Sequence, residues 1–150
     1  MSVSNTEGMQ ALTAHLLETH RIAEPVFVAG PADSPDDAKR YPGFVQALAS
    51  AGSLRRALVC GNDRMALGIL DVFGPAGIRV PEDVIVTGFD GIEAGRLSTP
   101  RLITVHQPMA DLARAAMWAM LSRLQRPDQP PITSRLPVEV LLRESSEGAL

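Results

Sequence analysis

The sequence lacks several features that would indicate a particular class of protein. It has a single cysteine, Cys60, which excludes an internal disulfide framework and favours a reducing compartment. Aromatic residues make up only 4% of the chain, so the core has to be aliphatic. The net charge of −3 provides no basic footprint for nucleic acid. What remains is the composition of an ordinary globular domain, 45% hydrophobic and 21% charged.

Export and membrane signals are also missing. Residues 1–10 are polar and contain no apolar core of the kind found in signal peptides. No apolar run approaches the length of a transmembrane helix. We therefore expect a cytoplasmic protein without a membrane partner. A chain of 150 residues predicts one domain.

Short apolar runs alternate with segments of helical periodicity along the chain. Helices are expected at 5–19, 34–51, 62–73 and 109–124, and strands at 25–30, 57–61, 84–88, 102–105 and 136–142. Pro42 leaves two alternatives for the second helix, because it either kinks the helix or delays its start until after Tyr41. Residues 145–150 are expected to form a frayed tail.

This alternation predicts an α/β fold of the Rossmann-like type, with a mostly parallel sheet and flanking helices. The strands are continuous apolar runs, which is typical of a sheet covered on both faces.

A search for catalytic chemistry is negative. The sequence has no Gly-x-Ser-x-Gly elbow, no phosphate-binding loop and no dinucleotide fingerprint. The three histidines lack metal-ligand spacing, and Cys60 is interpreted as a structural thiol. We therefore expect no catalytic residue, no metal and no cofactor. An enzyme using Asp63 or Asp90 is the weakest alternative, because no base–nucleophile pair is visible.

Polar side chains follow the predicted strands where each one ends. Asn62 and Asp63 follow one strand, Asp90 follows another, and Arg40 lies beyond a third. In an open α/β sheet the carboxyl ends of neighbouring strands form a ligand-binding crevice. An amide, a carboxylate and a guanidinium suit a polyhydroxylated small molecule. Asp63 is assigned mainly to capping the following helix, and Asn62 to the ligand.

Several ordered motifs resemble one family. Ala66-Leu67-Gly68 follows Asn62-Asp63, and further matches are residues 77–84, Gly88-Phe89-Asp90 and 99–108. Together they resemble the effector-binding domain of the LacI/GalR family of bacterial transcription regulators. The resemblance implies a periplasmic-binding-protein type I fold, in which two Rossmann-like subdomains hold a sugar or nucleobase effector. It implies ligand contacts at the following positions: Arg40, Asn62, Asp90 and Gln107.

The match also has departures. The family's helix-turn-helix and most of its first subdomain are not in this sequence, residues 49–56 replace a longer segment, and Gly91 replaces a second aspartate. The resemblance thus assigns 1–106 and 132–145 to the C-terminal subdomain. It assigns 107–126 to a helix that normally packs on the N-terminal subdomain. We expect that helix to self-associate or to re-dock on the sheet.

Two functions follow from this interpretation. The leading one is a small-molecule effector-binding module. The resemblance implies a homodimer formed along helix 64–73 and the loop after Gly91. DNA would be contacted only through a helix-turn-helix that is not present in this sequence. The alternative is a ligand-free dimerisation or interaction fragment of such a regulator. A periplasmic sugar-binding protein shares the fold but would need a secretion signal.

Overall fold

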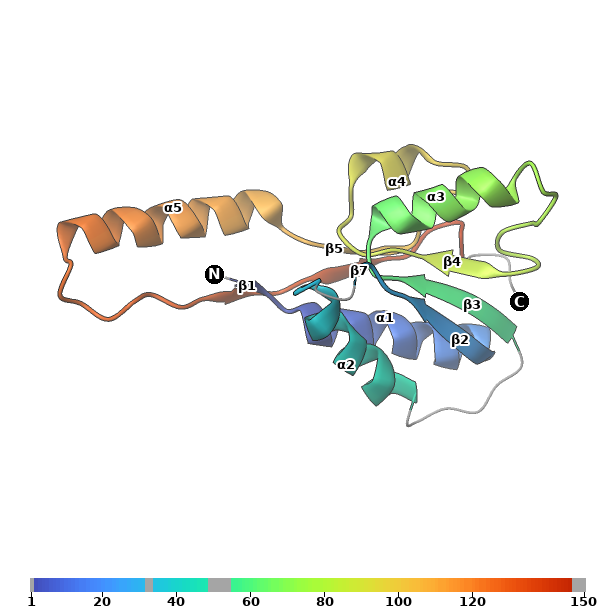
Figure 1. The fold of residues 1–150 in the computed structure, drawn as a ribbon, viewed down its shortest axis with the longest axis horizontal. Coiled ribbons are helices and arrows are strands. Elements are labelled where there is room, and N and C mark those ends of the chain that lie inside the picture. Colours follow the sequence, from blue (N-terminus) through green and yellow to red (C-terminus); the bar gives the residue numbers. More distant parts are fainter. Residues whose placement is uncertain (1, 32–33, 49–54, 147–150) are drawn as a thin grey trace.

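The computed structural model describes residues 2–31, 34–48 and 55–146, and Figure 1 shows their arrangement. The elements follow one another in this order: β1 (Ser2–Val3), α1 (Asn5–His20), β2 (Ile22–Val28), α2 (Asp37–Leu48), β3 (Arg55–Cys60), α3 (Asp63–Phe73), β4 (Ile85–Thr87), α4 (Glu93–Leu97), β5 (Thr104–His106), α5 (Met109–Gln125), β6 (Arg135–Leu136) and β7 (Glu139–Leu141).

Most predicted elements are confirmed, and several details differ. Strand β2 begins and ends earlier than the predicted 25–30, and β5 begins and ends later than the predicted 102–105. Helix α2 begins at Asp37 and runs through Pro42, so a start after Tyr41 is wrong. The predicted terminal strand is interrupted at Pro137 and forms two short strands, β6 and β7. The very short elements β1 and α4 were not predicted, because two and five residues are too few to show a periodicity. The predicted end of the second helix, at residue 51, lies outside the described residues.

The sheet is mostly parallel, as predicted. Strands β2, β3 and β4 pair in parallel in that order, with Val26 opposite Leu58 and Leu58 opposite Val86. Parallel bridges from Thr87 to Ile103 and from Asp90 to His106 connect β4 to the β5 segment. Strand β7 then joins β5 in the antiparallel direction. The carboxyl ends of β3, β4 and β5 therefore meet at one edge of the sheet.

Helices cover both faces of this sheet, as the continuous apolar strands predict. Figure 1 shows α1 and α2 on one side and α3 and α4 on the other. Ile85 and Val86 are adjacent in β4 and point to opposite faces, yet both are buried. Met9 and Leu12 of α1 fill the larger of two hydrophobic clusters. Cys60 belongs to the smaller cluster under α3, so its prediction as a structural thiol agrees with its burial.

Helices α1 and α2 approach each other closely at Gly43. A Cβ atom added at Gly43 would lie 2.1 Å from the carbonyl oxygen of Thr6 and 2.9 Å from the backbone nitrogen of Gln10. The Thr6 hydroxyl donates a hydrogen bond of 2.7 Å to the carbonyl of Lys39. This contact places the start of α1 beside Arg40 on α2.

The predicted frayed tail is wrong at its first residues. Ser145 and Ser146 are buried. The Ser145 hydroxyl donates to the carbonyl of Val86 and accepts from the amide of Ile103, both at 2.8 Å. It therefore bridges β4 and the start of β5, where their backbone groups need partners. Residues 147–150 lie outside the described part.

Helix α5 projects away from the layered core (Figure 1). None of its residues is buried, so the expectation that it re-docks on the sheet is wrong. Nothing in the described ranges forms a helix long and apolar enough to cross a bilayer.

Candidate functional site

Arg40 lies at the centre of a polar network at the carboxyl edge of the sheet. Its guanidinium donates to the Asn5 amide oxygen at 3.2 Å, to the Gly61 carbonyl at 2.7 Å and to the Asp90 carboxylate at 3.2 Å. The same group lies 4.0 Å from the centroid of the Phe89 ring, a cation–π distance. Only 3% of Arg40 is exposed. Helix α2 thus carries a buried cation that donates to α1 and to the two connections that follow β3 and β4.

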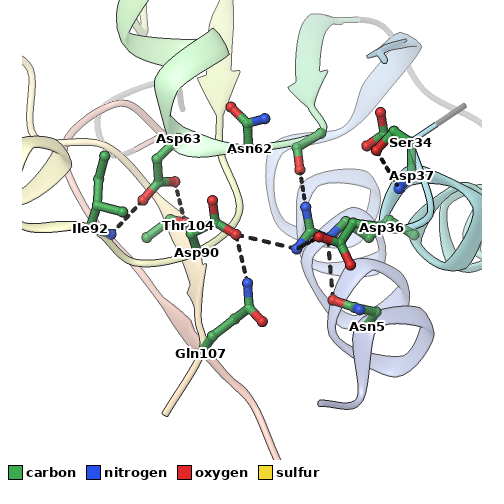
Figure 2. A network of polar contacts seen from close by, with 12 residues as sticks. Asn5, Ser34, Asp36, Asp37, Asn62, Asp63, Asp90, Ile92, Thr104 and Gln107 are labelled. Atoms are coloured by element: carbon green, nitrogen blue, oxygen red, sulfur yellow. Dashed lines mark hydrogen bonds and ion pairs between the residues drawn. The ribbon is translucent and has the colours of Figure 1, made fainter. Parts of the chain in front are cut away.

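Asp90 is held in a backbone conformation that few residues other than glycine adopt. Its φ angle is 131°, in a strained region for a residue with a Cβ atom. Its amide donates to Val105 at 2.9 Å, and its carbonyl accepts from the Gln107 amide at 3.1 Å. The Gln107 side chain donates to Asp90 Oδ1 at 2.6 Å, on the same oxygen that Arg40 contacts (Figure 2). Arg40 and Gln107 therefore converge on one carboxylate.

Charge at this edge is more negative than positive. Burial raises the pKa of Asp90, although the Arg40 charge and the Gln107 hydrogen bond lower it and the neighbouring Asp63 and Asp36 carboxylates raise it further. Asp36 also lies 3.9 Å from the Arg40 guanidinium. The Arg40 guanidinium therefore has two carboxylates beside it, and a third, that of Asp63, lies close enough to raise the pKa of Asp90.

Asn62 is the residue that caps helix α3. Its side-chain oxygen accepts from the Met65 amide at 2.9 Å, as an N-cap does. The residue is half-buried, and its amide NH₂ group is left to donate elsewhere. The assignment of capping mainly to Asp63 is wrong, since Asp63 is the first residue of the helix proper.

Asp63 is fully buried and has a different role. Its carboxylate accepts from the Thr104 hydroxyl at 2.5 Å and from the Ile92 amide at 2.8 Å (Figure 2). Its own amide donates to the Phe89 carbonyl at 2.8 Å. Sequence reasoning missed Thr104 and Asn5 as members of this network. The available signals were weak, namely one threonine in an apolar run and one asparagine at a helix start.

The structure thus brings together Arg40, Asp90 and Gln107 and leaves Asn62 at the adjoining helix start. A hollow of about 560 Å³ opens beside Asp90 and Gln107, and Arg40 and Asn62 do not line it. Its wall includes Gly91, whose φ is 75°. A Cβ atom there would lie 2.6 Å from His106 Nδ1, so a second aspartate at this position would require His106 to move.

Reactive groups are scarce around the network. Burial, with a smaller effect from the Asp63 charge, raises the pKa of the Cys60 thiol to about 12, so the thiolate is not populated near neutral pH. Across residues 2–31, 34–48 and 55–146 no group of three or more histidine, cysteine, aspartate or glutamate residues is placed to hold a metal ion.

Known proteins resemble this chain in sequence. Residues 3–146 match the family model described as a periplasmic binding protein-like domain. The transcriptional repressor PurR of Pasteurella multocida is 27% identical over 173 residues, covering 96% of this chain and 52% of that protein. The ribose operon repressor of Haemophilus influenzae is 34% identical over 101 residues, covering 67% of this chain and 30% of that protein. The chain thus spans about half or less of the length of these relatives.

Solved structures agree in fold. A LacI family regulator from Enterococcus faecalis with bound ribose superposes with a TM-score of 0.86 at 22% identity, covering 96% of this chain and 61% of that chain. The regulator CelR in complex with cellobiose gives a TM-score of 0.84 at 24% identity, covering 95% of this chain and 52% of that chain. The repressors named above are not enzymes. The chain therefore belongs to the periplasmic-binding-protein-like domain family, in the form carried by LacI-family transcriptional regulators.

Proposed function

We propose that this chain binds a small polyhydroxylated effector, with a sugar favoured over a nucleobase, at the carboxyl edge of its sheet. The observation that carries the proposal is the convergence of Arg40 and Gln107 on the Asp90 carboxylate. Both bonds end on Oδ1, which leaves Oδ2 with acceptor capacity for ligand hydroxyls. The amide of Asn62 supplies a donor from the neighbouring helix start. The ribose and cellobiose bound by the structural neighbours support a sugar.

The domain division supports a role as one part of a switch. We assign 1–106 and 132–145 to the C-terminal subdomain, and 107–126 to a helix that packs against an N-terminal subdomain in a complete regulator. In such a regulator the ligand shifts the equilibrium between two arrangements of the subdomains, which alters DNA binding through a helix-turn-helix outside these 150 residues. A DNA-binding regulator works in the cytoplasm, which is the location we propose.

Ribose is the first probe for this proposal. In isothermal titration calorimetry we expect ribose or a related sugar to bind to the unmodified chain. Asp90→Asn should weaken binding at least about tenfold, because it replaces one charged acceptor oxygen by an NH₂ donor and leaves the other as a neutral, weaker acceptor. Asp71→Asn makes the same chemical change on the exposed part of α3 and should leave the affinity unaltered. An equal loss of affinity in the two variants, or an affinity that Asp90→Asn leaves unchanged, would refute the proposed site.

Helix α5 supports a second candidate role, that of a dimerisation module that acts without ligand. One side of the helix is fully open, with Met117, Met120 and Leu124 exposed by 55%, 52% and 71%. The other side is partly covered, where Ala119 and Ser122 line a hollow shared with the returning segment at 129–132. The open side is therefore an apolar stripe to which none of the residues described by the structure provides a partner. The stripe consists of Ala110, Ala113, Met117, Met120, Leu121 and Leu124.

We propose that the same stripe of a second copy covers it in the antiparallel direction. Alanines occupy the N-terminal half of the stripe and large side chains occupy the C-terminal half, so only an antiparallel pair places small residues opposite large ones. Met117 lies at the middle of the helix, where the two-fold axis of such a pair would pass. No member of the stripe carries a charge that would have to be buried.

Sedimentation velocity across a range of protein concentrations tests this pairing. We expect the unmodified chain to sediment faster as its concentration rises, and Met117→Glu to remain a monomer throughout, because it would bury two facing carboxylates. Ser122→Glu adds the same charge on the other side of α5 and should sediment like the unmodified chain. A monomer at every concentration in the unmodified chain would contradict the pairing.

A further inference from the structure

We propose that Asp63 is a positioning residue that fixes the Asp90 carboxylate in its ligand-ready orientation; the inference rests on the proposed function. Asp63 makes its contacts on both sides of Asp90. Its amide donates to the carbonyl of Phe89, and its carboxylate accepts from the amide of Ile92. The segment between these two contacts therefore has both ends attached to one residue at the start of α3.

A third contact attaches this residue to the next strand. The Thr104 hydroxyl donates to Asp63 Oδ1 at 2.5 Å, within a fully buried environment. Asp90 itself bonds through its amide to Val105, the residue after Thr104. Strand β5 and Asp63 therefore form a common frame for Asp90.

The backbone of Asp90 requires such a frame. A φ of 131° is strained for an aspartate and persists where surrounding contacts determine it more strongly than local preference does. Without the contacts to Phe89 and Ile92, the segment would be free to relax to a negative φ. Such a change would turn the carboxylate away from Arg40 and Gln107.

The approach of Asp63 depends on Gly88. A Cβ atom added at Gly88 would lie 2.1 Å from Asp63 Oδ1 and 3.0 Å from its Cα atom. The carboxylate therefore occupies the space that any side chain at position 88 would fill. Within the described ranges no salt bridge reaches Asp63, so its charge is satisfied by hydrogen bonds and by the N-terminus of α3. These interactions are directional, which suits a residue that sets an orientation.

Thr104 gives the cleanest test, because it can be changed without removing the buried carboxylate. The measurement is hydrogen exchange followed by NMR in the ligand-free protein. The amides of Asp90 and Ile92 should exchange about tenfold faster in Thr104→Val, because this variant loses the hydrogen bond from the hydroxyl to the charged Asp63 carboxylate. Thr104→Ser retains the hydroxyl and should restore slow exchange. The amide of Leu12 in α1 is the internal reference. Unchanged exchange at Asp90 and Ile92 in Thr104→Val would overturn the proposal.

Ribose binding provides the second readout. We expect Thr104→Val to weaken ribose binding about tenfold and Thr104→Ser to stay within about threefold of the unmodified chain. In a double-mutant cycle, Thr104→Val should have little further effect in the Asp90→Asn background, because the group that it positions is already altered. Additive losses would indicate general destabilisation and overturn the positioning role. If the unmodified chain does not bind ribose, the proposed ligand fails, and the exchange measurement still decides whether Asp63 positions Asp90.

Discussion

Replacing Arg40 by leucine is expected to lower the free energy of unfolding by about 3–5 kcal/mol, a large fraction of the stability of a domain of this size. The leucine would fill part of the space but remove the donor of the buried Gly61 carbonyl, and it would leave the half-buried Asp90 carboxylate with Gln107 as its side-chain partner and no cation beside it. It would also remove the guanidinium from the face of the Phe89 ring. Urea unfolding followed by circular dichroism measures the effect.

The matched control is Arg79→Leu. Arg79 also forms an ion pair, with Asp83, but both side chains are well exposed, at 69% and 40%. Exposed pairs contribute about 0–1 kcal/mol, so this variant should remain close to the unmodified chain. Similar losses for the two variants would mean that Arg40 is not the structural centre described above. Because Arg40 supports the fold, its removal is a poor test of ligand binding, and Asp90 is the better residue for that purpose.

Gly43→Ala is expected to be nearly as damaging, although it adds one methyl group. The new Cβ atom would meet the backbone of α1 at Thr6 and Gln10, and a backbone cannot rotate away as a side chain can. Helices α1 and α2 would have to separate, at a cost of about 3 kcal/mol or more. Thermal unfolding by calorimetry should show a lower midpoint.

Gly68→Ala is the control for Gly43→Ala. Gly68 lies inside α3, and a Cβ atom there would meet nothing within 4 Å. Alanine favours the helix over glycine by about 0.5–1 kcal/mol, so this substitution should raise the unfolding midpoint. The same chemical change is thus expected to have opposite signs at two helical positions. A loss of stability in both would argue against the close helix contact at Gly43.

Much of the fold was predictable because each long element has a strong local pattern. The apolar spacing of α1, α3 and α5 and the continuous apolar run of β3 predicted their positions to within a few residues. The parallel orientation of most strands followed from the alternation of strands and helices along the chain. The small elements β1 and α4 have too few residues for a pattern, and the pairing of β7 with β5 depends on residues more than 30 positions apart.

The location of the site was predictable from the sequence, but the roles of its individual residues were not. Asn62 and Asp63 are both good capping residues, so the sequence alone does not show which one caps. Asp63 does not cap helix α3, because its carboxylate is directed elsewhere. Gly88 leaves room for this carboxylate, and Thr104 donates a hydrogen bond to it. Ser145 was missed for the same reason, since the backbone groups that it bridges are about 40 and 60 positions away in sequence.

The surplus of carboxylates around Arg40 has a consequence for ligand selection. The single guanidinium is shared between Asp90 and Asp36, and Asp63 lies close enough to influence Asp90. A neutral sugar exchanges hydrogen bonds with this group without adding charge. A phosphorylated sugar would bring further negative charge to a half-buried region where screening by salt is weak. The residues proposed to recognise a free sugar would therefore discriminate against its phosphate ester, so the proposed site would distinguish a neutral sugar from the product of its phosphorylation.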